Sequence, residues 1–449
     1  MANQTYKGGV KITDWRPEDE TFWQQHGKTV ATRNLWISIP ALLLAFGVWV
    51  VWSVIVVKMP EVGFNFDKSQ LSWLLALPAL SGATMRIFYS FMVPVFGGRR
   101  WTTISTASLL IPMVWLGIAI QDINTPFWVF AVIALLCGFG GGNFSSSMSN
   151  ISFFFPKSQQ GMALGLNAGL GNLGVSTMQF VVPAVIGFAL FGAMAGHGQM
   201  SESGHVLYLQ NAGFVWVIPI MIVTVLAWFG MNDLAGASAS FKEQAVIFKR
   251  QHNWIMCILY LATFGSFIGF SAAFPMVIKQ SFPDVDPLKV AFLGPLVGAL
   301  FRPVGGWIAD KLGGAKVTLY NYVVMTLAVV AVMYFLKAGN FMGYFMCFMV
   351  LFITTGIGNG STFRMIPVIF RTMHERLNTP NVIHEARKES AAVVGFAGGF
   401  AAYGGFFIPK MFGSGLGVNG TFITLIVFYV ICIALTWWYY SRKGAAYPC

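Results

Sequence analysis

The sequence predicts an all-α polytopic membrane protein with twelve transmembrane helices, and three observations lead to this fold class. Of the 449 residues, 56% are hydrophobic and 10% are charged, whereas a soluble domain carries about 25% charged residues. The apolar residues form runs that can cross a bilayer, which needs about 20 residues of helix. Related motifs also recur in the two halves of the chain. The composition excludes an ordinary soluble enzyme and a disordered or disulfide-rich protein.

Twelve apolar runs, separated by polar segments, account for the predicted helices. They lie near 35–57, 71–97, 102–120, 127–155, 161–195, 213–231, 254–278, 290–309, 317–336, 341–370, 390–413 and 420–440. The predicted organisation is a cytoplasmic N-terminal segment 1–34, six-helix bundles 35–231 and 254–440, a cytoplasmic linker 232–253 and a cytoplasmic tail 441–449. In the N-terminal segment, Pro17 and three following acidic residues predict the first turn of a short helix, with Phe22 and Trp23 resting on the membrane surface.

The distribution of lysine and arginine predicts the orientation. Of the 28 basic residues, 19 fall in the N-terminal segment and the loops on the same side, 6 fall on the opposite side, and Arg86, Arg302 and Arg364 lie inside spans. Loops rich in lysine and arginine stay in the cytoplasm. Both termini are therefore expected in the cytoplasm, with the chain in the cell's inner membrane. The basic residues do not gather on one polar face, so no nucleic-acid partner is predicted.

Two sets of residues repeat between the halves. A glycine followed four residues later by arginine ends at Arg86 and again at Arg302, and a Gly-Gly pair begins eleven residues after each arginine. Glycines at 165, 169 and 174 recur at 395, 399 and 404, a constant offset of 230. Parallel repeats of six spans are typical of secondary transporters, whose substrate site lies between the halves near the middle of the membrane.

Several segments resemble a known family. Residues 306–313, which include Asp310, resemble the loop motif of the major facilitator superfamily, although the first copy at 96–100 lacks the aspartate. The glycine-rich stretch 138–157, followed by 165–174, resembles the nitrate signature of the nitrate/nitrite porters. Residues 14–19 and 358–363 are similar to the NarK-type branch of that family. The resemblance implies the major facilitator fold, with two pseudo-symmetric six-helix halves, and transport of nitrate and nitrite.

The two repeated arginines are the predicted anion-binding groups. Each lies well inside a span, where an arginine costs roughly 2.5–3.5 kcal/mol even on lenient scales. All sixteen acidic residues fall in loops or at span edges, so a transported anion is the predicted partner. A guanidinium group offers planar paired donors that match a planar oxyanion. The alternative is an arginine satisfied by backbone carbonyls at a helix interface. Arg364, near the end of its span, is interpreted as an interfacial anchor.

The resemblance also implies an asparagine and a tyrosine that hold the anion and phenylalanine rings that flank it. These roles carry over to Asn172, Tyr260, Phe46, Phe144, Phe264 and Phe363. Neutral N–H and O–H donors suit an anion, and apolar rings exclude water, which favours a weakly hydrated anion over phosphate or sulfate. Ordinary ring packing and, for Asn172, a helix–helix hydrogen bond are the alternatives.

Glycines mark the helices that are expected to move. Small residues every fourth position let helices pack closely and slide, as rocking of two halves requires, and static close packing is the alternative. The glycines assigned to this role are Gly165, Gly169, Gly171, Gly174, Gly395, Gly399 and Gly404. None follows a strand or precedes Lys-Ser/Thr, so a phosphate-binding loop is excluded.

Three classes of function are compatible with a polytopic chain. The predicted one is a monomeric exchanger of nitrate and nitrite that works by alternating access within the lipid bilayer, with no cofactor and no metal. The second is a proton-coupled nitrate symporter or a carrier of another small anion. A membrane enzyme would need buried His, Cys or carboxylate groups at a reaction centre, and all six histidines fall in loops or at span margins. Because proton-driven carriers relay protons through such groups, exchange is the preferred mechanism.

Overall fold

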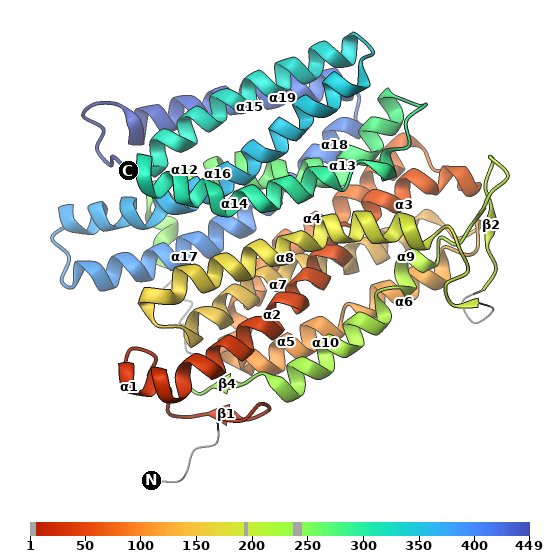
Figure 1. The fold of residues 1–449 in the computed structure, drawn as a ribbon. Coiled ribbons are helices and arrows are strands. Elements are labelled where there is room, and N and C mark those ends of the chain that lie inside the picture. Colours follow the sequence, from red (N-terminus) through yellow and green to blue (C-terminus); the bar gives the residue numbers. More distant parts are fainter. Residues whose placement is uncertain (1–5, 193–195, 237–244) are drawn as a thin grey trace. The chain divides into compact units, whose positions relative to one another are not determined.

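The structure, a computed structural model, describes residues 6–192, 196–236 and 245–449. Residues 237–244 of the predicted linker lie outside this part. The chain divides into two compact units, Met1–Ala239 and Ser240–Cys449, each treated by itself below. In Figure 1 the first unit runs from red to yellow-green and the second from green to blue. Both are built of long helices, which confirms the predicted fold class.

Most residues of the first unit lie in helices, and a few form short strands. Its elements are β1 Lys11–Ile12, α1 Glu20–Phe22, the π-helix η1 Trp23–Gly27, α2 Lys28–Val50, α3 Trp52–Lys58, the 3-10 helix η2 Pro60–Val62, α4 Lys68–Phe96, α5 Gly98–Ala107, α6 Leu110–Ala119, α7 Phe127–Phe154, α8 Lys157–Val185, β2 Gln199–Met200, β3 Val206–Leu207, α9 Asn211–Phe214, α10 Val217–Gly230 and β4 Asp233–Leu234. Strand β1 pairs in parallel with β4, and β2 pairs in antiparallel with β3.

The second unit is also helical. Its elements are the 3-10 helix η4 Ala245–Lys249, α12 Gln251–Tyr260, the π-helix η5 Leu261–Gly265, α13 Ser266–Ser281, the 3-10 helix η6 Pro287–Lys289, α14 Leu293–Leu312, α15 Gly314–Lys337, α16 Phe341–Arg376, α17 Val382–Ala402, α18 Gly404–Gly413, α19 Gly417–Thr436 and the π-helix η7 Trp437–Ser441.

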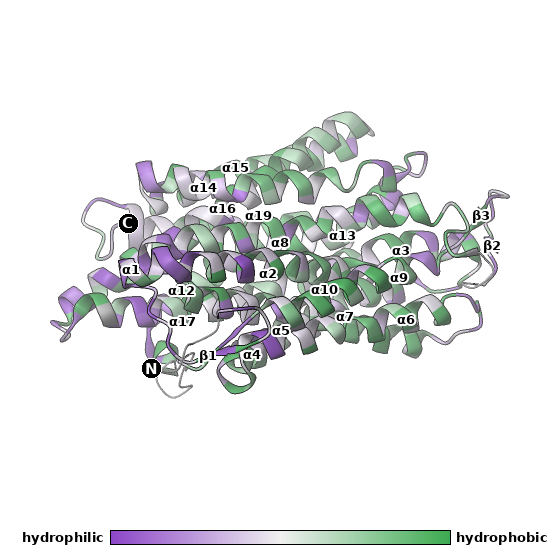
Figure 2. Cartoon of the chain, turned by 60° about the horizontal axis from the view of Figure 1, so that its bottom comes forward, coloured by the Kyte–Doolittle hydropathy of each residue, from purple (hydrophilic) through white to green (hydrophobic). Residues whose placement is uncertain are grey.

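Within the described residues, eleven helical stretches are long and apolar enough to cross a membrane. The remaining predicted span, α8, has 29 residues. Its glycines, amides and hydroxyls make it less apolar than the others, which is why length and hydropathy together do not select it. Along the helices, hydrophobic residues occupy the middle, while hydrophilic residues gather toward the ends and the loops (Figure 2).

The N-terminal segment differs from its prediction. The helix begins at Glu20 rather than at Pro17, because the side chain of Asp19 caps it by accepting a hydrogen bond from the Phe22 N–H at 3.1 Å. Phe22 and Trp23 are buried. The Trp23 ring packs edge-on against Phe155 at the end of α7, 5.8 Å between centroids. These rings therefore find apolar partners inside the first unit, and their placement on the membrane surface was wrong.

A carboxylate caps helix α5, although the first copy of the loop motif lacks its aspartate. Asp233 in β4 is buried, and its Oδ1 accepts hydrogen bonds from the backbone N–H groups of Arg99 and Arg100 at 2.9 and 3.3 Å. Its Oδ2 accepts from Arg99 Nε at 3.2 Å. A carboxylate at a helix N-terminus is favourable because the first N–H groups have no partner within the helix. The segment after α10 thus supplies a charge that the motif does not contain.

The variant Asp233→Asn is expected to lower the thermal unfolding midpoint of the purified protein. Asparagine keeps the shape of the side chain but removes the negative charge that the α5 N-terminus and Arg99 share, and breaking a buried ion pair costs about 3–5 kcal/mol. Unfolding in detergent, followed by fluorimetry, measures the shift. The matched control is Asp122→Asn in an exposed turn. Equal midpoints for the two variants would contradict the capping role.

Candidate functional site

Arg86 lies on α4 in the interior of the first unit. It is 1% exposed, and its Nε donates a hydrogen bond to the carbonyl oxygen of Gly141 on α7 at 2.9 Å. Its guanidinium carbon lies 5.2 Å from the ring centroid of Trp49 and 4.7 Å from that of Phe144. The alternative considered from the sequence, a hydrogen bond to a backbone carbonyl, is therefore made by Nε of Arg86. The two ring faces add cation–π stabilisation, about 0.5–2 kcal/mol for each ring.

Glycines allow the helices around Arg86 to approach closely. A Cβ atom on Gly138 of α7 would lie 2.7 Å from the backbone nitrogen of Gly82 on α4. A Cβ atom on Gly141 would lie 2.6 Å from the indole of Trp49. Side chains at these positions would separate α4 from α7 and displace the carbonyl that binds Arg86. The glycine-rich run 138–142 therefore positions the arginine.

Three aromatic side chains from α2 and α7 form a cluster beside Arg86. The Phe46 ring contacts Trp49 and Phe144, with centroids 5.5 and 6.0 Å away. Phe46 and Phe144 were assigned to the site from the sequence, whereas Trp49 was not. Its only signal in the sequence is its position three residues after Phe46, which places the two on the same face of one helix.

Asn172 on α8 is 1% exposed, and neither atom of its amide has a hydrogen-bond partner among the described residues. A buried polar group without a partner costs about 1–3 kcal/mol. Asn167, five residues earlier on α8, instead donates to Ser147 Oγ on α7 at 2.8 Å. The helix–helix hydrogen bond considered for Asn172 is therefore made by Asn167, and the Asn172 amide is available to a ligand.

The second unit brings four predicted residues together. Arg302 on α14 is 7% exposed and donates from Nη2 to the Tyr260 hydroxyl at 3.1 Å, while its Nη1 is buried with no hydrogen-bond partner in the described part. Its guanidinium carbon lies 5.2 Å from the Phe363 centroid and 6.0 Å from the Phe264 centroid. Tyr260 stacks on both rings, with centroids 4.3 and 5.3 Å away. Phe264 lies in the π-helix η5, an irregularity that is frequent at functional sites.

Arg364 has a partner that the sequence analysis did not assign. It forms an ion pair with Asp310 of the loop motif on α14, and both side chains are 52% exposed. An exposed pair of this kind contributes at most about 1 kcal/mol. Its exposure fits a position near the membrane surface rather than in the anion site.

Six of the seven glycines assigned to moving helices fall into two groups. Gly171 and Gly174 of α8 lie against α2, and Gly404 lies against Gly265, so these three permit close packing. A Cβ atom on Gly165, Gly169 or Gly395 would have no described atom within 4 Å. Gly399 is buried. The first group therefore packs closely against neighbouring helices, and the role of all seven glycines in helix movement stays a prediction.

Two titratable groups are buried although the sequence placed them at span margins. Glu389 lies inside α17, because this helix starts at Val382, eight residues before the predicted span. Its oxygens accept hydrogen bonds from Arg250 Nε and Nη2 at 2.9 and 2.8 Å. His374 on α16 has its Nε2 3.3 Å from Glu389 Oε1. Both groups therefore lie buried within helices rather than in loops, and this cluster is relevant to proton coupling.

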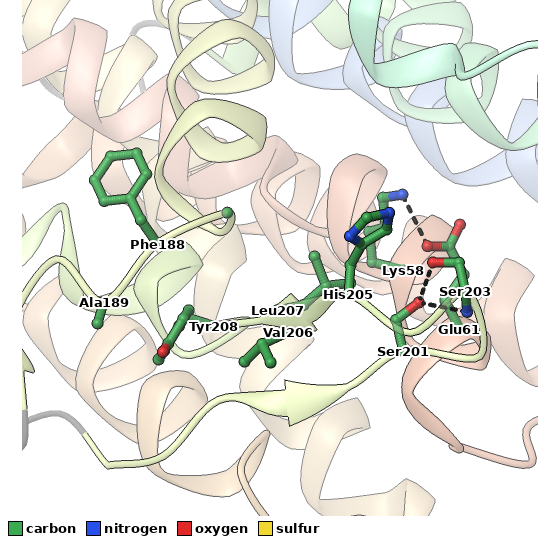
Figure 3. Close-up of a pocket in the computed structure, with 11 residues that line it drawn as sticks. Lys58, Glu61, Phe188, Ala189, Ser201, Ser203, His205, Val206, Leu207 and Tyr208 are labelled. Atoms are coloured by element: carbon green, nitrogen blue, oxygen red, sulfur yellow. Dashed lines mark hydrogen bonds and ion pairs between the residues drawn. The ribbon is translucent and has the colours of Figure 1, made fainter.

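A pocket of about 700 Å³ occurs elsewhere in the first unit, between the end of α3 and the segment that carries β3 (Figure 3). Four of its polar side chains are paired with one another: Lys58 with Glu61 at 2.8 Å, and Ser201 with Ser203 at 2.9 Å. None of the predicted site residues lines it. It is therefore separate from the Arg86 cluster.

Known proteins resemble this chain in sequence and in fold. The model of the Major Facilitator Superfamily matches residues 37–408. The nitrate/nitrite transporter NarU of Escherichia coli (strain K12) is 51% identical over 99% of both chains. A probable nitrate/nitrite antiporter, NarK2 of Thermus thermophilus, is 41% identical over 98% of this chain and 99% of its own. The solved D-xylose–proton symporter shares the fold at 14% identity, with a TM-score of 0.67 over 91% of this chain and 97% of its own.

Proposed function

Because the chain belongs to the Major Facilitator Superfamily and to its nitrate/nitrite transporters, we propose that it is a secondary transporter that exchanges nitrate for nitrite across the cell membrane by alternating access. It is a carrier rather than an enzyme. The proposal rests on an arrangement that occurs in both units, called the cradle below. In each unit, a buried arginine at the equivalent position of the repeat lies against two aromatic rings.

The chemistry of the cradles suits a small planar anion. Arg86 and Arg302 stay charged at every physiological pH and provide planar N–H donors. Arg302 Nη1 and the Asn172 amide have buried donors without a partner among the described residues, and nitrate oxygens can accept from them. The surrounding rings of Phe46, Phe144, Phe264 and Phe363 exclude water, which disfavours strongly hydrated anions. Tyr260, whose hydroxyl accepts a hydrogen bond from Arg302 Nη2 at 3.1 Å, completes the eight residues of the proposed site.

The proposal includes a membrane setting and an orientation. The carrier is a monomer in the inner membrane, with both termini in the cytoplasm, and the excess of lysine and arginine on that side supports the orientation. Lipid surrounds it, in keeping with large apolar side chains exposed on α15, such as Leu327 at 63% and Val330 at 51%.

Counterflow in proteoliposomes tests the function. Vesicles that contain the purified protein and internal nitrite are expected to take up labelled nitrate faster than protein-free vesicles, and the reverse gradient should drive labelled nitrite. Sulfate and phosphate should not replace either anion. Absence of nitrate uptake with every internal anion would refute the proposal.

Removal of one flanking ring is expected to weaken selectivity. In Phe144→Ala or Phe363→Ala, water enters beside the arginine, so the preference for nitrate over sulfate and phosphate should fall while the protein stays folded. Competition of unlabelled anions against labelled nitrate uptake measures it. Phe130→Ala on α7 and Phe348→Ala on α16 are matched controls, since both rings are buried and pack against other aromatics. Unchanged competition in both site variants would assign the rings to packing alone.

A further inference from the structure

Trp49 is fixed in place more firmly than an ordinary buried aromatic side chain. It is 1% exposed at the end of α2, and its indole Nε1 donates to the Pro78 carbonyl on α4 at 2.8 Å. Its ring fills a slot between two glycines. A Cβ atom on Gly82 would lie 2.6 Å from Nε1, and one on Gly141 would lie 2.6 Å from Cε2. The indole therefore cannot turn without loss of a hydrogen bond or a clash with backbone.

The ring face of this indole lies against the Arg86 guanidinium group. The Arg86 carbon Cζ is 5.2 Å from the Trp49 centroid and 4.7 Å from the Phe144 centroid, and Nε is hydrogen-bonded to Gly141. Two ring faces and one carbonyl define the plane of a guanidinium group. A planar donor group recognises a planar anion only when its orientation is right, so whatever fixes that plane contributes to affinity.

The second unit holds its arginine in another way. Phe264 and Phe267 follow Phe46 and Trp49 at a constant offset of 218 residues. The Phe267 ring packs on Gly298, the repeat counterpart of Gly82. A phenylalanine cannot donate a hydrogen bond, and Arg302 is instead tied to the Tyr260 hydroxyl. The indole tether is thus a feature of the first unit.

We propose that Trp49 is a positioning residue for anion binding, which holds the Arg86 guanidinium group in the orientation that nitrate requires. The inference rests on the proposed function, since it assigns a residue to the same anion site. Trp49 is not one of the predicted site residues, and we assign it no direct contact with the anion.

Substitutions at Trp49 test this role. Trp49→Leu keeps apolar bulk but removes the ring face and the tether, and we expect the KM for nitrate uptake to rise on the order of 10-fold, in line with a desolvated cation–π contact. Trp49→Phe restores a ring and should recover part of the affinity. The maximal rate should change less than KM. Trp52→Leu is the matched control, because Trp52 is equally buried, begins α3 and packs against Phe130.

A double-mutant cycle separates positioning from packing. In an Arg86→Lys background no planar group is left for the indole to orient. Addition of Trp49→Leu to Arg86→Lys should therefore lower kcat/KM for nitrate by less than a further 2-fold. Size-exclusion profiles and thermal midpoints show that each variant is folded. If Trp49→Leu does not fold, Trp49→Phe, which lacks the tether, takes its place in the cycle.

The outcomes distinguish the inference from the function on which it rests. Additive effects of the Trp49 and Arg86 substitutions, or an equal rise in KM in Trp52→Leu, would overturn the positioning role while parent transport of nitrate persists. Failure of the parent protein to transport nitrate or nitrite would overturn the proposed function itself.

Discussion

Arg86→Lys and Arg302→Lys are each expected to lose most nitrate transport while the protein remains folded in the membrane. Lysine keeps the positive charge, but its three N–H donors all lie on one nitrogen and are not coplanar. It therefore cannot hold the Gly141 contact of Arg86, or the Tyr260 contact of Arg302, and also present paired coplanar donors to the anion. A hydrogen bond to a charged group contributes about 1.5–3 kcal/mol, and each loss should lower kcat/KM for nitrate about 10- to 100-fold.

Uptake of labelled nitrate measures the loss of transport, and calorimetry in detergent measures the loss of nitrate binding. Arg371→Lys is a matched control, because Arg371 is exposed and pairs with Glu375 one turn away. That variant should transport nitrate at the parent rate. Parent-like nitrate affinity in either site variant would mean that charge alone, rather than the guanidinium geometry, recognises the anion.

The helices were predictable from the sequence because apolar runs of the right length have few other uses. The same rule places helix ends poorly, and the start of α17 shows why. Residues 382–389 were assigned to the loop before the predicted span, but the helix begins at Val382 and buries Glu389. The charge of Glu389 is matched by Arg250, which lies 139 residues earlier. A span edge judged from hydropathy cannot reveal such a partner.

The sequence likewise predicted some residues of the candidate site and missed others. Tyr260, Phe264, Arg302 and Phe363 come from α12, η5, α14 and α16, and the structure brings them into contact. The family resemblance named them, while their joint role in anion binding stays a prediction. Trp49 carried no motif, and a tryptophan in an apolar run is ordinary in a membrane helix. Its role depends on a slot formed by Gly82 and Gly141, and only tertiary structure shows that slot.

Asp233 illustrates a further limit of local motifs. The loop motif was incomplete in the first half, and no local pattern pointed to a carboxylate in a segment 134 residues after Arg99. A helix N-terminus attracts any carboxylate that the fold brings near it. A carboxylate that is missing from a sequence motif can therefore be supplied to the same place in the fold by a distant segment.

Nitrate uptake is expected to depend on an outgoing anion. The empty carrier has two buried guanidinium charges that stay ionised, and a bound nitrate neutralises part of that charge, so the loaded carrier should change conformation more readily than the empty one. Glu389 is a buried carboxylate that proton symport could use. It already accepts two hydrogen bonds from Arg250 and lies beside His374, and its protonation would break that pairing. Exchange with nitrite needs no such step.

The deciding measurement is the uptake of labelled nitrate into proteoliposomes under four conditions, with or without internal nitrite and with or without an inward proton gradient. Exchange predicts strong uptake in both nitrite-loaded preparations and little in the others, because reorientation of the empty carrier limits the rate. The variant Glu389→Gln, if folded, should keep the same dependence on internal nitrite. Strong uptake driven by the proton gradient with no internal anion would rule out obligate exchange and establish the symport alternative, with Glu389 and His374 as its first candidates for the proton site.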